Sequence, residues 1–156
     1  MALEIVSLEH LPNSHKVYVA LFRDVQNSAF LHQQLLARNP QFEYAFIDAS
    51  VIADAYRRYG ISPSTKDLIV VKVTFPGEDG AEPLTHDQIW EHLKTNVEGE
   101  ALPITDDQIS STTDVPKVRK YYKLNGLKWL DDIKDEKAKQ KEMESLVIGA
   151  MALRGV

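Results

Sequence analysis

The chain has 156 residues, a formal net charge of −5 and a pI near 5.5, and it contains no cysteine. This length suits one compact domain that buries its own core, and 44% hydrophobic with 26% charged residues excludes collagen-like and largely disordered classes. The acidic balance argues against a surface that is basic throughout, and the lack of cysteine excludes disulfides, zinc ribbons and thiol catalysis and favours an intracellular protein.

The first half of the chain alternates strands and helices. Residues 15–22 carry apolar side chains on both faces of a strand, which predicts a strand covered on both sides. A helix from Asn27 or Ser28 to about 39 and a second apolar strand at 42–49 follow. Residues 52–59 predict a short helix that Gly60 ends, and residues 67–73 form the most apolar strand of the chain.

The second half is predicted to be mainly helical. After a polar loop at 76–83, Thr85 and Gln88 have the spacing of a capping box, and an apolar stripe follows them. A second cap at Thr105 precedes a shorter segment, and a basic helix is expected at 115–123. The last helix runs from about 135 to 153, with Met143, Leu146, Val147 and Ala150 facing the core.

No catalytic or metal motif stands out. The five histidines lack the i, i+4 pairing of a metal site, and no phosphate loop, dinucleotide loop or nucleophile elbow is present. We therefore predict no metal, no cofactor and no enzyme. The residues 1–12 have no basic cluster typical of a signal peptide, and no run is long enough to span a membrane, so no membrane partner is expected. One alternative remains, a small α/β enzyme that uses His86, Asp87 and His92.

The basic helix has two interpretations. Its cationic side chains are Lys117, Arg119, Lys120 and Lys123. Together with Tyr121 and Tyr122 they could contact RNA through phosphates and base stacking. Alternatively, Val118 and Tyr122 face the core while the basic side chains are solvated, and helix periodicity alone favours this second interpretation.

An ordered series of segments resembles a known family. These segments are "LFRDVQNSAFL", "AFIDASVI", "IADAYRRYGIS" before "LIVVKV", "TDVPKVRKYYKL" and a final "LRGV". Their order resembles the small kinase-binding subunits of the KEOPS complex, also called EKC, over nearly the whole chain. The resemblance implies one α/β domain over residues 1–156, an α+β two-layer sandwich with a small mixed β-sheet flanked by helices.

The resemblance also implies a function. Members of the family are non-catalytic subunits that dock directly on the small kinase-like ATPase of the complex, contact its other subunits indirectly, and support threonylcarbamoyl modification of transfer RNA. They also contact the 3′ end of transfer RNA, and fungal members are connected with telomere maintenance. The implied location is the nucleus and the cytoplasm.

Two surfaces are expected to meet the kinase. The first is the helix at 52–59, with Tyr56 packed inward and Arg57, Arg58 and Tyr59 offered to the partner; the alternative is that both tyrosines belong to the core. The second is the tip of the last helix, at Leu153, Arg154 and Val156, because an apolar and basic chain end has little of its own domain to pack against.

The resemblance breaks at residues 50–54. There the family carries a further helix, a basic loop and a strand before the helix that corresponds to 52–59. In this chain, residues 50–54 connect the two flanking segments directly. Loss of a strand and a helix exposes backbone donors and part of a core. We therefore expect exposed apolar surface in this chain.

Overall fold

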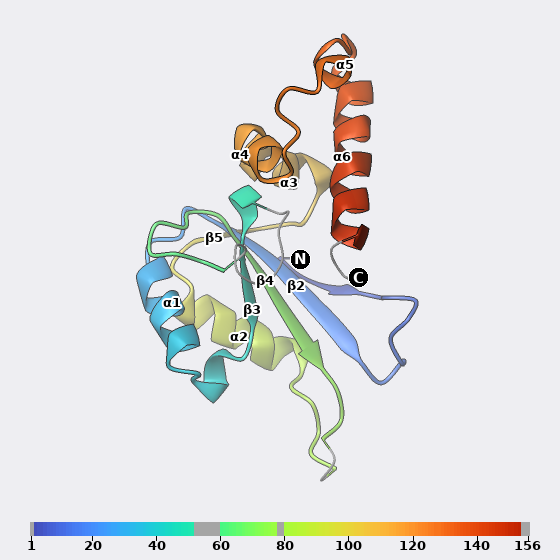
Figure 1. Ribbon diagram of the computed structural model, residues 1–156. Coiled ribbons are helices and arrows are strands. Elements are labelled where there is room, and N and C mark those ends of the chain that lie inside the picture. Colours follow the sequence, from blue (N-terminus) through green and yellow to red (C-terminus); the bar gives the residue numbers. More distant parts are fainter. Residues whose placement is uncertain (1, 52–59, 78–79, 154–156) are drawn as a thin grey trace.

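The computed structural model describes residues 2–51, 60–77 and 80–153, and these residues form a five-stranded sheet with helices on one face and beyond one end (Figure 1). The strands are β1 (Leu3–Val6), β2 (Lys16–Arg23), β3 (Ala45–Asp48), β4 (Leu68–Thr74) and β5 (Glu100–Leu102). Their order is β1-β2-β4-β3. Strand β5 pairs with residues 21–23 of β2, next to the part of β2 that pairs with β1. The expected α/β class is confirmed. The described pairings are all antiparallel, however, so the sheet is not mixed.

Two helices, α1 (Ser28–Leu36) and α2 (His86–Asn96), cover one face of the sheet. Leu31 of α1 and Ile89 and Leu93 of α2 are buried against Tyr18, Ala20 and Phe22 of β2. The predicted capping box begins α2: Thr85 Oγ1 accepts from the Gln88 backbone N–H at 3.3 Å, and the Thr85 N–H donates to Gln88 Oε1 at 2.9 Å. Short 3-10 turns, η1 (Pro40–Phe42) and η2 (Ala49–Val51), flank β3.

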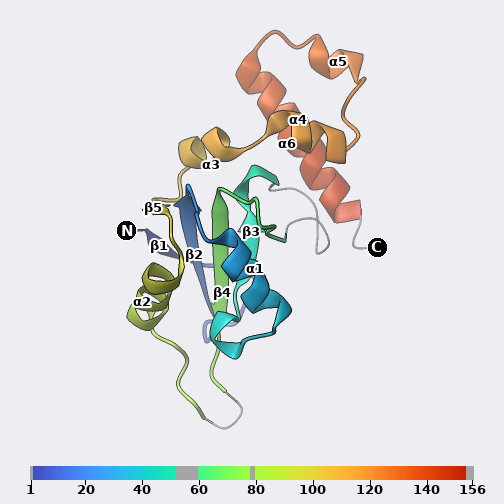
Figure 2. The ribbon, with the colours of Figure 1, turned by 90° about the vertical axis from the view of Figure 1, so that its left-hand side faces the viewer.

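The remaining helices gather beyond one end of the sheet (Figure 2). They are α3 (Asp106–Thr112), α4 (Val115–Tyr121), α5 (Lys128–Asp131) and α6 (Glu136–Leu153). We call α4, α5 and α6 the helical unit, because they pack around a core of their own. Val118, Tyr122, Leu124 and Leu130 are buried there, and the predicted stripe of α6 packs against them. The described chain therefore has two main cores, one under the sheet and one in the helical unit.

Some sequence predictions differ from the structure in detail. Phe42 lies in η1 rather than in a strand, and Phe30 of α1 is 41% exposed and packs edge-on against Phe42. Asn27 precedes α1 without a side-chain capping bond, because its side chain donates to the Asn96 carbonyl and accepts from the Glu98 N–H. The predicted helix at 52–59 lies outside the described residues.

Candidate functional site

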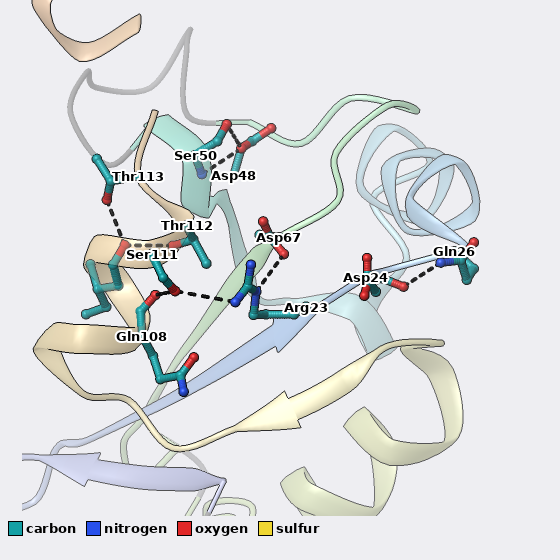
Figure 3. Close-up of polar contacts among 11 residues, drawn as sticks. Arg23, Asp24, Gln26, Asp48, Ser50, Asp67, Gln108, Ser111, Thr112 and Thr113 are labelled. Carbon is teal, nitrogen blue, oxygen red and sulfur yellow. Dashed lines mark hydrogen bonds and ion pairs between the residues drawn. The ribbon is translucent and has the colours of Figure 1, made fainter. Parts of the chain in front are cut away.

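Polar contacts attach α3 and the helical unit to the end of the sheet. Arg23 at the end of β2 donates to Asp67 Oδ1 at 3.4 Å and to Ser111 Oγ of α3 at 3.3 Å (Figure 3). The Ser50 carbonyl of η2 accepts from the Asp114 N–H at 3.1 Å, and Ser50 Oγ accepts from Lys117 Nζ at 3.2 Å. These bonds fix the start of α4 beside the end of β3.

The start of α4 is well capped. Asp114 Oδ1 accepts from the Lys117 N–H at 3.0 Å, and a proline, Pro116, occupies the first turn, where its missing N–H costs nothing. One turn later Val118 and Tyr122 face inward, as periodicity predicts. The helix therefore has one face committed to the core of the helical unit.

A groove of about 570 Å³ runs between α3, α4 and α6. Its apolar lining includes Ile109, Val118, Met143 and Val147, and charged side chains from the first half of α6 also line it. Arg119 also lines it. The Arg119 guanidinium donates from Nη2 to Asp131 Oδ1 at 2.6 Å and to the Leu124 carbonyl at 3.4 Å, while its buried Nε has no hydrogen-bond partner.

The outer face of α6 is uncharged over its last turns. It consists of Ser145, Ile148, Gly149 and Ala152, which follow each other at helical spacing and are all exposed, with Leu153 beside them. Ile148 is 65% exposed and Leu153 is 78% exposed. We call these five residues the α6 face. An exposed, uncharged helix face with bulky apolar side chains is typical of a surface that packs against another helix.

The structure separates the four basic residues predicted to bind RNA. Arg119 points inward and is paired with Asp131, and Lys117 contacts Ser50. Lys120 and Lys123 are exposed. The surface that α4 offers to an anionic partner is therefore smaller than the sequence suggested.

The predicted kinase-contact residues are only partly described. Tyr56, Arg57, Arg58, Tyr59, Arg154 and Val156 lie outside the described residues. Leu153 is described, and its large exposure shows that its own domain does not bury it. Sequence reasoning missed the rest of the α6 face. The signal was the absence of charge at 145, 148, 149 and 152, in a helix whose first half is highly charged.

The residues of the alternative enzyme site are engaged separately. His86 contacts its neighbour Asp87 at 3.2 Å and the Leu3 carbonyl at 3.2 Å, and the Asp87 side chain is 96% exposed. His92 instead stacks on Tyr44 and bonds the Tyr44 hydroxyl through Nδ1 at 3.0 Å. Burial, with the Lys72 ammonium, lowers the pKa of His92, and burial raises the pKa of Tyr44.

These contacts give each histidine its own structural role, and they form no shared catalytic arrangement. Within residues 2–51, 60–77 and 80–153, no group of three or more metal-ligating side chains is placed to hold an ion. In the same residues no helix is long and apolar enough to cross a bilayer. The geometry therefore does not support the interpretation of His86, Asp87 and His92 as an enzyme site.

The described residues form an α/β fold in which a sheet with one helix-covered face is joined to a helical unit with an exposed, uncharged helix face. Comparison with known proteins specifies it further. The family model described as kinase binding protein CGI-121 matches residues 22–55 and 51–155. The chain belongs to the kinase binding protein CGI-121 family.

Curated fungal relatives agree with this assignment. The EKC/KEOPS complex subunit CGI121 of Gibberella zeae is 71% identical, with all of both chains covered. The corresponding subunit of Neurospora crassa is 40% identical, also with full coverage of both, and that of Coccidioides immitis is 36% identical over 98% of each chain. The resemblance found in the sequence is thereby confirmed.

The lengths of the alignments can be compared with the expected internal break. The alignment with the Gibberella zeae subunit has 197 positions, whereas this chain has 156 residues, so at least 41 positions have no counterpart here (197 less 156). The two stretches that match the family model meet at residues 51–55. The absence of a segment near residues 50–54 stays a prediction.

Proposed function

We propose that this chain is a non-catalytic accessory subunit of the EKC/KEOPS complex that binds the small kinase-like ATPase of the complex through the α6 face. The observation that carries the proposal is an uncharged, exposed helix face in a member of a kinase-binding family. Bulky apolar side chains in the centre of such a face supply the energy of an interface. The other subunits of the complex are indirect partners.

In this proposal the chain contributes position rather than chemistry. Met143, Leu146 and Val147 pack α6 against the buried residues of α4 and α5, so the α6 face is already formed before a partner binds. A preformed helix loses little conformational entropy when it binds, which favours affinity. By binding the kinase, the subunit supports threonylcarbamoyladenosine modification of transfer RNA by the complex, in the nucleus and the cytoplasm, with a role in telomere maintenance.

Transfer RNA is a proposed further partner. Lys120 on α4 and Lys123 just after the end of α4 are exposed, and their ammonium groups suit phosphate contacts. With a net charge of −5 on the chain, such binding has to be local and sensitive to salt. This contact would place the 3′ end of the transfer RNA close to the helical unit.

A substitution on the α6 face tests kinase binding. Ile148→Asp and, separately, Leu153→Asp should each weaken binding to the purified kinase by about 2 kcal/mol or more, roughly 30-fold in Kd, the scale of losing an interface anchor. Both side chains are mostly exposed, so the melting temperature should change little. Isothermal titration calorimetry measures the affinity. Removal of Arg154 to Val156 extends the test to the chain end.

The matched control is Leu36→Asp. Leu36 is 71% exposed at the end of α1, away from the helical unit, and its substitution should leave kinase affinity unchanged. Unchanged affinity in Ile148→Asp and Leu153→Asp would reject the α6 face as the interface. An equal loss of folding stability and affinity would instead mean that these side chains stabilise the fold.

A further inference from the structure

The outer side of α1 carries no charge. The helix Ser28–Leu36 contains no Asp, Glu, Lys or Arg, and it packs on the sheet through Leu31 and Leu35. Its exposed residues, together with its C-cap, are Ala29, Phe30, Gln33, Leu36 and Ala37. We call these five residues the α1 face. Leu36 is 71% exposed and Phe30 is 41% exposed, so the face presents two bulky apolar side chains to solvent.

The α1 face is symmetric about Gln33. An alanine lies four residues before it and another four residues after it, at Ala29 and Ala37, and the bulky Phe30 and Leu36 lie three residues away on either side. At about 100° per residue, Phe30 and Ala37 point to one side of Gln33, and Leu36 and Ala29 point to the other side. Each side of the face therefore holds one large and one small side chain, at opposite heights along the helix.

A face with this symmetry is complementary to itself when two such helices run antiparallel about a two-fold axis. The axis passes beside Gln33, and the symmetry inverts the height of each residue while keeping its side. Phe30 of one copy then lies against Ala37 of the other, and Leu36 lies against Ala29, with offsets of about 1.5 Å along the helices. The two Gln33 amides meet at the axis, where each can donate to the other and accept from it.

The charges at the two ends of α1 favour the same arrangement. Asp24 lies before the helix and Arg38 follows it, and both are exposed. Antiparallel pairing brings the acidic end of one copy toward the basic end of the other, whereas parallel pairing would bring like charges together. Because the centre of the face is uncharged, two chains that each carry a net charge of −5 can meet there without placing like charges side by side.

We propose that the α1 face binds a second copy of this chain in a two-fold symmetric dimer with antiparallel α1 helices. One pair of nine-residue helices makes a small interface, so the dimer is expected to be weak and to depend on protein concentration. Helix α1 lies on the sheet, while α6 stands beyond its end (Figure 1). The dimer therefore leaves the α6 face free, and the inference does not depend on the proposed kinase contact.

Single-cysteine variants test the geometry, because the full chain contains no cysteine. Gln33→Cys should form a disulfide-linked dimer on mild oxidation by dioxygen, which takes up the two electrons and two protons of the paired thiols. Leu36→Cys alone is the matched control. Its two copies would lie about 9 Å apart along the helices, beyond the Cα separation of about 7 Å that a disulfide spans. Mixed with Ala29→Cys, however, Leu36→Cys should form the mixed disulfide.

Sedimentation velocity over a range of protein concentrations tests the dimer without cross-linking. Leu36→Asp should weaken self-association by about tenfold or more, whereas Leu84→Asp, at an exposed leucine before α2, should leave it unchanged. Melting temperatures of these variants should stay close to that of the parent chain, because both side chains are largely exposed.

Three results would overturn the proposal. One is a parent chain that stays monomeric at every concentration. Another is cross-linking of Gln33→Cys no faster than that of Leu36→Cys, which would show random collision. The third is self-association that Ile148→Asp abolishes and Leu36→Asp does not, which would assign the contact between copies to the α6 face.

Discussion

Leu130→Ala should destabilise the helical unit more than the sheet. Leu130 is fully buried among Val118, Tyr122 and Leu124, and α6 packs over them. Truncation of a buried leucine costs the transfer energy of the lost atoms plus that of the residual cavity, about 2–5 kcal/mol. Met143 and Val147 of α6 are only partly buried and can move inward to fill part of the cavity. We therefore expect the free energy of unfolding to fall by an amount near the middle of this range, about 3 kcal/mol.

That loss is large for a domain whose total stability is typically about 5–15 kcal/mol. It should fall first on α4, α5 and α6, because these helices have their own core and are joined to the sheet by polar contacts such as the two bonds to Ser50. Chemical denaturation measures the total loss, and native-state amide exchange shows where it falls. Exchange should accelerate in α6 well before it does in β2.

Leu93→Ala is the matched control. Leu93 is 1% exposed in the core between α2 and the sheet, so its truncation should accelerate exchange in β2 and β4. If Leu130→Ala accelerated exchange equally in α6 and β2, the two cores would unfold as one cooperative unit. The reasoning from separate cores would then be refuted.

Three further predictions concern other parts of the chain. Burial, and further the Lys72 ammonium, lowers the pKa of His92 below 6.5. The free energy of unfolding should therefore fall as the pH drops through 6.5 toward the pKa of the folded state. The denaturation midpoint of His92→Gln should lack this pH-dependent fall. Lys120→Glu with Lys123→Glu should weaken transfer-RNA binding and reduce its salt dependence, while Lys134→Glu with Lys141→Glu should not; equal affinity for both pairs would reject the α4 contact. Gly99→Ala should cost about 1–3 kcal/mol in a thermal melt, because its Cβ would lie 2.9 Å from the Arg23 carbonyl oxygen and 3.0 Å from Val25 Cγ2; an unchanged melt would show that this contact relaxes freely.

The sequence by itself determined the local features of this protein. The capping box at Thr85 and Gln88, the inward positions of Val118 and Tyr122, and the α6 stripe each depend on residues within a few positions of one another. Helical and strand periodicity therefore predicted them. The ordered segments also gave the family, since they span most of the chain.

Only the tertiary structure decided how distant residues meet. Arg119 points inward because α5 places Asp131, twelve positions later, beside it. His92 of α2 bonds Tyr44, which lies just before β3. The antiparallel order β1-β2-β4-β3 and the partly exposed second face likewise depend on long-range pairing. Apolar residues at consecutive positions predict that both faces of a strand are buried. Which segment covers each face depends on where the chain returns in space, and local periodicity carries no information about that.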